Sequence, residues 1–121
     1  MEASFLEGKY SLEICIESGF IDFTINIDLK KQDFEVIEKN SERATLLHAV
    51  FHHYFQLKET SLGLEEQRKY LDIILHSKKS EVEDFLTKID LGNANGTISN
   101  MIRITCNKDQ SLLRQGNWFN Q

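Results

Sequence analysis

Apolar and polar residues alternate over two stretches near the start of the chain, residues 10–17 and residues 21–29. Alternation with a period of two is typical of strands that bury one face and leave the other in solvent. Ser18 and Gly19 lie between the two stretches, and a short connection containing glycine favours an antiparallel hairpin. Because side chains alternate across a strand, one face of this hairpin should carry several acids. These acids are Glu13, Glu17, Asp22 and Asp28.

The spacing of apolar residues changes to three and four in the middle of the chain, which predicts four helices with one buried stripe each. Small polar residues or glycine precede the helices and should cap them. The expected caps are Asp28, Ser41, Ser61 or Gly63, and Ser80. Glu83 would complete a capping box with Ser80, and Gly92 should end the last of the four helices.

Residues 97–106 are rich in β-branched side chains and follow a run of turn-forming residues, so they predict a third strand. The remaining tail is polar except for four residues that should pack back as a short strand or flap, namely Leu112, Leu113, Trp118 and Phe119. We therefore expect one α+β domain over residues 1–121, with an N-terminal β-hairpin, three to four helices and a C-terminal strand. Its small antiparallel sheet should have helices packed on one face.

The composition fits an ordinary globular domain, because 40% of the 121 residues are hydrophobic and 27% are charged. No apolar run reaches the roughly 18 residues that a membrane helix needs. The N-terminus carries acids where a secretory signal peptide would carry bases. We therefore expect a cytoplasmic protein that makes no contact with a membrane.

The net charge of −5 is unevenly distributed along the chain. Residues 1–29 contain six acids and one base, whereas residues 30–121 contain thirteen of each. This balance disfavours direct nucleic-acid binding, which needs clustered Lys and Arg. A local field of one sign attracts partners of the opposite sign, although the same acids can simply solubilise the outer face of a sheet.

Three histidines lie close together at His48, His52 and His53. The spacing of four between the first two would place both imidazoles on one helix face, as a zinc pair requires. The residue after His48 is Ala49, however, where a zinc protease of the H-E-x-x-H type carries its glutamate base. We expect no metal and no cofactor. A small enzyme or a metal-binding or ligand-binding domain that uses this cluster stays as the alternative function.

Other constellations that could support catalysis are incomplete. Cys15 and Cys106 are single cysteines with no base placed beside them by spacing. The acids of the hairpin form pairs, but an open sheet face lacks the pocket that tunes a glycosidase carboxyl group. The loop of residues 92–96 is rich in glycine, but we expect it to precede a strand, whereas a phosphate-binding loop precedes a helix. We therefore expect no enzymatic activity.

Several stretches resemble the immunity proteins of bacterial contact-dependent growth inhibition and polymorphic toxin systems. They are residues 41–53 (SERATLLHAVFHH), 56–59 (QLKE), 94–101 (ANGTISNM) and 115–119 (QGNWF). The resemblance covers most of the chain as an overall profile and includes no diagnostic motif. It implies a protein that binds a cognate toxin domain, often a nuclease, and blocks its active site or substrate groove.

The four hairpin acids are the expected contact residues for such a basic toxin domain. Glu35, Glu38 and Glu42 are expected to extend this surface. A second hypothesis places the contact at Trp118, Phe119 and the loop of residues 92–101, because tryptophan is enriched at binding hot spots. We expect a monomer or a weak homodimer, and a structural adaptor that pairs through the hairpin edge is a third possibility.

Overall fold

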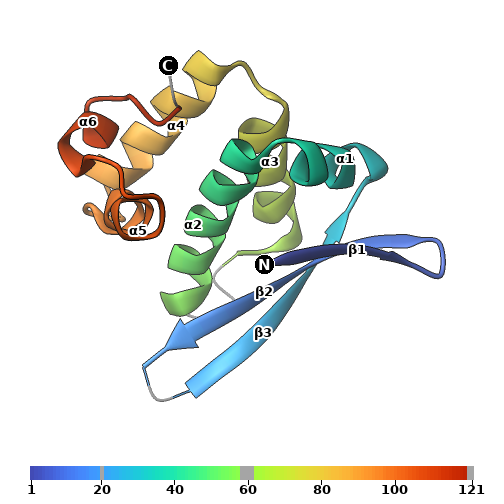
Figure 1. Ribbon diagram of the computed structural model, residues 1–121. Helices are drawn as coiled ribbons and strands as arrows, with labels where there is room; N and C mark the ends of the chain where they lie inside the picture. The colour runs from blue at the N-terminus through green and yellow to red at the C-terminus, as the bar shows by residue number, and fades with distance from the viewer. Residues whose placement is uncertain (20, 58–61, 120–121) are drawn as a thin grey trace.

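The computed structural model describes residues 1–19, 21–57 and 62–119, and it begins with a three-stranded antiparallel sheet (Figure 1). The strands are β1 (Glu2–Leu6), β2 (Lys9–Ser18) and β3 (Ile21–Leu29), in the spatial order β1-β2-β3. The predicted hairpin of β2 and β3 is confirmed, but β1 was not predicted. Glu7 and Gly8 join β1 to β2 with φ values of 53° and 76°. Two consecutive positive φ angles are typical of a tight type I′ hairpin turn.

Six helices follow the sheet in the described part of the chain. They are α1 (Lys31–Lys39), α2 (Ser41–Leu57), α3 (Leu64–His76), α4 (Lys79–Leu91), α5 (Thr97–Cys106) and α6 (Gln110–Arg114). The first four are the predicted helices. Helix α2 is the central one, because it contacts β2 on one side and α1, α3 and α5 on others. Figure 1 shows α4, α5 and α6 grouped beyond α2 from the sheet, so the helices cover one face of the sheet and leave the other open.

The predicted strand at residues 97–106 is wrong, because these residues form helix α5. Ile98 and Ile102 are buried and Met101 packs against the same core, which is a helical spacing of three and four. Ile104, which a strand would turn to the same face as Ile102, is 65% exposed. The tail likewise forms helix α6 instead of a strand or flap. Asp109 caps α6 by accepting hydrogen bonds from the amides of the following turn.

Three of the predicted helix caps, namely Asp28, Ser41 and Ser80, are wrong. The cap of α1 is Lys30, whose amide donates to Asp33 at 2.8 Å, and Asp28 belongs to β3. Helix α4 begins at Lys79, and Glu83 turns to the tail instead of capping it. Gly63 caps α3 and Gly92 ends α4 as predicted, Ser41 is the first residue of α2, and Ser61 lies outside the described residues.

The buried apolar residues form one cluster that joins the inner face of the sheet to all the longer helices after α1. Its fully buried members include Leu12, Ile14, Ile16, Leu47, Phe51, Leu71, Ile74, Leu86, Ile98 and Trp118. The inner face of the hairpin therefore supplies the core, as the alternation predicted. Among the described residues, no helix combines the length and the apolar character needed to cross a membrane.

Candidate functional site

The outer face of the sheet carries an exposed group of acids. Glu13, Glu17, Asp22 and Asp28 are all exposed there, as the alternation predicted. Strand β1 adds Glu2, which lies directly opposite Glu13. We call these five residues the acidic face. Figure 1 shows the helices on the opposite side of the sheet, so no described helix covers the acidic face.

Cross-strand neighbours on the acidic face include two pairs of like charge. Glu2 is paired in register with Glu13, and Glu17 is paired with Asp22. Like charges directly opposite one another destabilise a sheet. Among the described residues, one ion pair involves the acidic face: Lys9 Nζ lies 3.1 Å from Asp28 Oδ1. Both side chains of this pair are largely exposed. The acidic face therefore keeps most of its negative charge and presents it to solvent.

The prediction missed Glu2 because it missed the strand that carries it. The residues Glu2, Ser4 and Leu6 share one face of β1, and Ala3 and Phe5 share the other. This alternation was readable in the sequence, but a strand of five residues offers few periods. The Glu7-Gly8 dipeptide was the second available indication, since glycine in a two-residue connection is typical of hairpins.

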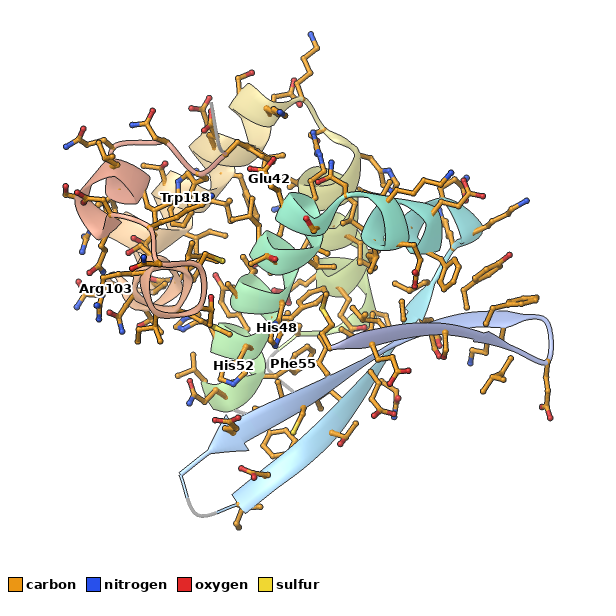
Figure 2. All side chains as sticks on the ribbon, viewed as in Figure 1. Glu42, His48, His52, Phe55, Arg103 and Trp118 are labelled. Carbon is orange, nitrogen blue, oxygen red and sulfur yellow. The ribbon has the colours of Figure 1, made fainter. Side chains whose placement is uncertain are left out.

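The three clustered histidines do not share one side of α2, because His53 points away from the other two. His48 and His52 lie on one side of α2 with their ring centroids 6.0 Å apart (Figure 2). The Nε2 atom of His52 accepts a hydrogen bond from the Glu17 amide at 3.4 Å, and Gln56 donates to the Glu17 carbonyl at 2.8 Å. His52 and Gln56 thus bind the part of the β2 edge that β1 does not reach. His53 is buried apart from them, in the core.

Burial lowers the pKa of all three imidazoles. Burial is the main cause that lowers the pKa of His48 to about 4, and the nearby N-terminal ammonium and His52 add to it. Burial also lowers the pKa of His52 and of His53, although the charges of Glu17 and Asp90, respectively, oppose it. No cysteine or acid joins His48 and His52 as a third ligand in the described part of the chain. His48 lines a cavity together with Glu2 and Glu38, but His52 and His53 are not among the residues that line it.

A different group of potential ligands meets between α1 and α3. Asp33, Asp72 and His76 bring ligand atoms within 4.8 Å of one another. Arg68 already supplies a cation there, since it donates to both Asp33 oxygens at 2.7 Å and to Asp72 at 2.6 Å. Burial raises the pKa of Asp33, but the hydrogen bonds from Arg68 and His76 outweigh it and bring the pKa to about 2. We interpret this group as an ionic link between helices.

The glycine-rich loop of residues 92–96 precedes helix α5, so the expectation that it precedes a strand is wrong. A phosphate site at this loop is excluded on other grounds. The buried carboxylate of Asp90 accepts a hydrogen bond from the Ser99 amide at 2.9 Å, in the first turn of α5. The carboxylate already places a negative charge at this helix N-terminus, where a phosphate would bind.

Trp118 and Phe119 pack back into the core, and this corrects the hypothesis that they contact a partner. Trp118 is fully buried and Phe119 is 5% exposed. The indole Nε1 donates to Thr87 Oγ1 at 2.9 Å, and the Glu83 carboxylate accepts from the amides of Trp118 and Phe119 at 3.0 and 3.3 Å. These contacts fix the tail on helix α4, so neither side chain is available to a partner in this structure.

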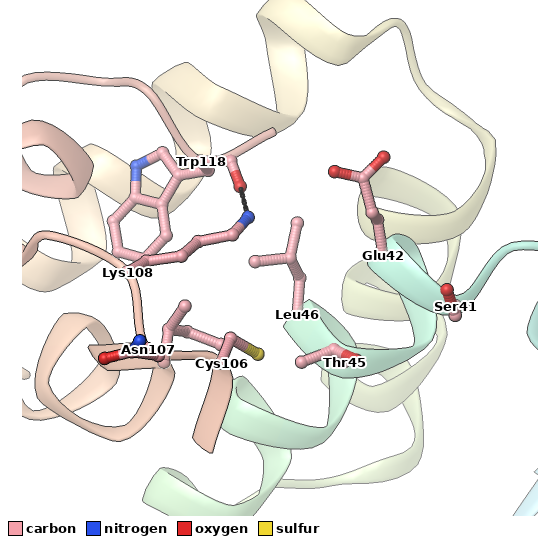
Figure 3. Close-up of a pocket in the computed structure, with 9 residues that line it drawn as sticks. Ser41, Glu42, Thr45, Leu46, Cys106, Asn107, Lys108 and Trp118 are labelled. Atoms are coloured by element: carbon pink, nitrogen blue, oxygen red, sulfur yellow. Dashed lines mark hydrogen bonds between the residues drawn. The ribbon is translucent and has the colours of Figure 1, made fainter. Parts of the chain in front are cut away.

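A cavity of about 410 Å³ lies between the start of α2 and the end of α5 (Figure 3). Glu42, Cys106 and Lys108 are among its lining residues. Lys108 Nζ is engaged by the Trp118 carbonyl at 3.1 Å, so the lysine holds the tail. Cys106 is an exposed free thiol, as is Cys15 on β2. The Cys106 Sγ atom lies 3.6 Å from the Thr105 hydroxyl.

The three further glutamates expected on the acidic face are dispersed. Glu38 lies on helix α1, where it lines a cavity together with Glu2, so it borders the acidic face near β1 but does not lie on it. The Oε1 atom of Glu35 lies 3.9 Å from the Nζ atom of Lys31, and both residues belong to α1. Glu42 lines the cavity of Figure 3, on another side of the molecule.

Comparison with known proteins adds no assignment. No protein-family model matches the chain, and no curated protein and no solved structure matches it.

Proposed function

We propose that this protein is an immunity protein, which binds a basic toxin domain of the nuclease class through its acidic face and so neutralises it. The observation that carries the proposal is the pairing of like charges in register, Glu2 with Glu13 and Glu17 with Asp22. Such pairs reduce the stability of the sheet. A cationic partner would remove this repulsion on binding and replace it with attraction.

A toxin that cleaves nucleic acid supplies the complementary surface. Its substrate groove must carry Lys and Arg to bind phosphates. The acidic face would compete with the substrate for this groove, and its field would steer the encounter and raise the association rate. This mechanism needs no catalytic group in the inhibitor. The resemblance to immunity proteins in the sequence supports the same role.

The test uses the protein encoded directly beside the gene for this protein, which we expect to contain the toxin domain. Co-expression should restore growth of cells that produce the toxin, and the two proteins should purify as a one-to-one complex. The double variant Glu13→Lys/Asp22→Lys should slow association by about an order of magnitude or more at low salt, because it reverses the steering charge. Glu81→Lys on helix α4 changes an exposed acid outside the acidic face and should leave the rate nearly unchanged.

Two results would contradict the proposal. The first is an association rate of the double variant equal to that of the wild type at every salt concentration. The second is a failure of the protein to protect cells although both proteins are produced and folded.

A further inference from the structure

Strand β3 lies at the border of the sheet, and no described helix or strand pairs with its outer edge. The strand is nine residues long and stays in register with β2 over its full length. An unpaired edge presents a row of amide and carbonyl groups that can bind another strand. The other border of the sheet is formed by β1, which is only five residues long, and beyond its end the side chains of His52 and Gln56 bond to the backbone of β2.

The backbone groups on the outer edge belong to the same residues that carry the acids. The backbone amide and carbonyl of Glu17 bond to α2 side chains and therefore point away from β3. Because the direction of the backbone groups alternates along a strand, all odd-numbered residues of β2 point this way and the even-numbered residues point to β3. The even-numbered residues of β2 are paired with the odd-numbered residues of β3, so these two sets form the hydrogen bonds between the strands. The outer edge is therefore formed by the backbones of Asp22, Thr24, Asn26 and Asp28. Outside the pairing of β2 with β3, no described backbone hydrogen bond involves Thr24 or Asn26.

This edge lacks the usual features that prevent strand addition. Strand β3 contains no lysine and no proline, and its continuous register with β2 leaves no bulge. Its acids do oppose pairing with a second copy. In the register that pairs the whole strand with itself, Asp22 would lie opposite Asp28 of the other copy, and this is unfavourable. The same acids favour an incoming strand with cations on that face.

Apolar surface accompanies the acids on the other side of the edge. Ile21 is 69% exposed and Phe23 is only partly buried, so an added strand with apolar residues facing the helices would cover them. A cavity of about 250 Å³ opens at the far end of the edge, beside Asp28 and Leu29 and against Leu71 of α3. In strand addition, main-chain hydrogen bonds supply affinity, and such side-chain pockets supply specificity.

We propose that the outer edge of β3 binds an extended segment of the partner protein as a fourth strand. In this segment Lys or Arg alternates with apolar residues. The cations face Asp22 and Asp28, and the apolar residues cover Ile21 and Phe23. This inference rests on the proposed function, since it names the kind of toxin segment that the acidic face receives.

The first test uses a nine-residue peptide of alternating lysine and valine as the probe. Its binding should slow amide hydrogen exchange at Thr24 and Asn26 by at least about tenfold, because these amides gain partners. A peptide N-methylated at alternate residues keeps the charge but cannot form the strand hydrogen bonds. It should bind at least about tenfold more weakly. Equal binding of the two peptides, or unchanged exchange at both amides, would overturn the proposal.

The second test uses variants of the protein. Thr24→Pro removes an outward amide that does not bond to β2, so the sheet should tolerate it as an edge strand does. It should weaken peptide binding at least about tenfold, whereas the matched control Thr24→Val, which keeps the amide, should not. If Thr24→Pro fails to fold, the comparison with the N-methylated peptide tests whether the edge of β3 forms strand hydrogen bonds. Light scattering tests the alternative that a second copy of this protein binds the edge. A dimer that the peptide dissociates would overturn the proposal that the edge binds a segment of another protein.

Binding of the toxin separates this inference from the proposed function. If the toxin binds Thr24→Pro and wild-type protein equally well but fails to bind Glu13→Lys/Asp22→Lys, the acidic face is the site and the edge is not. If the peptide binds the edge but no toxin forms a complex, the edge inference holds for another cationic partner and the immunity role fails.

Discussion

Arg68 donates two hydrogen bonds to the buried carboxylate of Asp33, one to each oxygen and each 2.7 Å long. This bidentate pair joins α3 to α1, and His76 adds a third hydrogen bond to the same carboxylate at 2.7 Å. Planar pairing of this kind is among the strongest polar contacts in proteins. It fixes the helix that directly follows β3, and so it fixes how the sheet is attached to the helices.

Replacing Arg68 with alanine should reduce the free energy of unfolding by about 3 kcal/mol, because it leaves the Asp33 charge buried without its main partner. Urea denaturation at pH 7 measures the change. Lys69→Ala provides the control, since Lys69 is exposed on the same helix and should change stability by less than about 0.5 kcal/mol. Equal effects of the two variants would show that the pair contributes little.

The stability of the protein should fall as the pH is lowered from about 6.5 to about 4. The pKa of His48 is lowered to about 4 in the folded protein, chiefly by burial. Below pH 6.5 the unfolded chain therefore binds a proton that the native state does not, and this favours unfolding. The contribution of His48 should approach roughly 3 kcal/mol at pH 4. Denaturation at several pH values should show a smaller slope for His48→Gln, and an identical slope would refute the assignment.

Two charge reversals on the acidic face should have opposite effects on stability. Asp22→Lys turns the repulsion with Glu17 into attraction and should stabilise the fold by about 0.5 kcal/mol. Asp28→Lys breaks the ion pair with Lys9 and should destabilise it by a similar amount. Thermal or urea unfolding of both variants gives the comparison. A loss of stability in Asp22→Lys would mean that the like-charge pair is not strained.

The tail should depend on Glu83. Glu83→Ala removes the acceptor of the Trp118 and Phe119 amides and should cost about 2 kcal/mol, because both amides lose a charged partner. Glu83→Gln keeps an acceptor oxygen and should cost less. Glu81→Ala, on the same helix but exposed, is the control and should be nearly neutral. Equal stability of Glu83→Ala and Glu81→Ala would contradict the described anchoring of the tail.

Strong periodicity explains which parts of the fold were predictable. The hairpin of β2 and β3 and the helices α1 to α4 each repeat their pattern over nine or more residues. The strand prediction for residues 97–106 is wrong because it depended on composition, and β-branched side chains favour strands. The spacing of Ile98, Met101 and Ile102 favours a helix. Packing against α2 decided the outcome, as tertiary contacts often override propensity.

The candidate site was predictable where it depended on alternation alone. Strand periodicity placed four acids on one face, and it needs no knowledge of distant contacts. The contribution of Glu2 required β1, and the burial of Trp118 required the pairing of the tail with α4. Hot-spot statistics favour exposed tryptophan at interfaces, but they cannot distinguish it from a tryptophan held in the core.

The anchoring of Trp118 also makes the protein its own optical reporter. Trp118 is the single tryptophan of the chain, and it lies beyond α2 from the sheet, with its indole bonded to Thr87 (Figure 2). Its fluorescence therefore follows the integrity of the α4 to α6 region without a label. A partner that binds the sheet should leave this emission unchanged, so the same sample reveals whether a variant has lost its fold or only its binding.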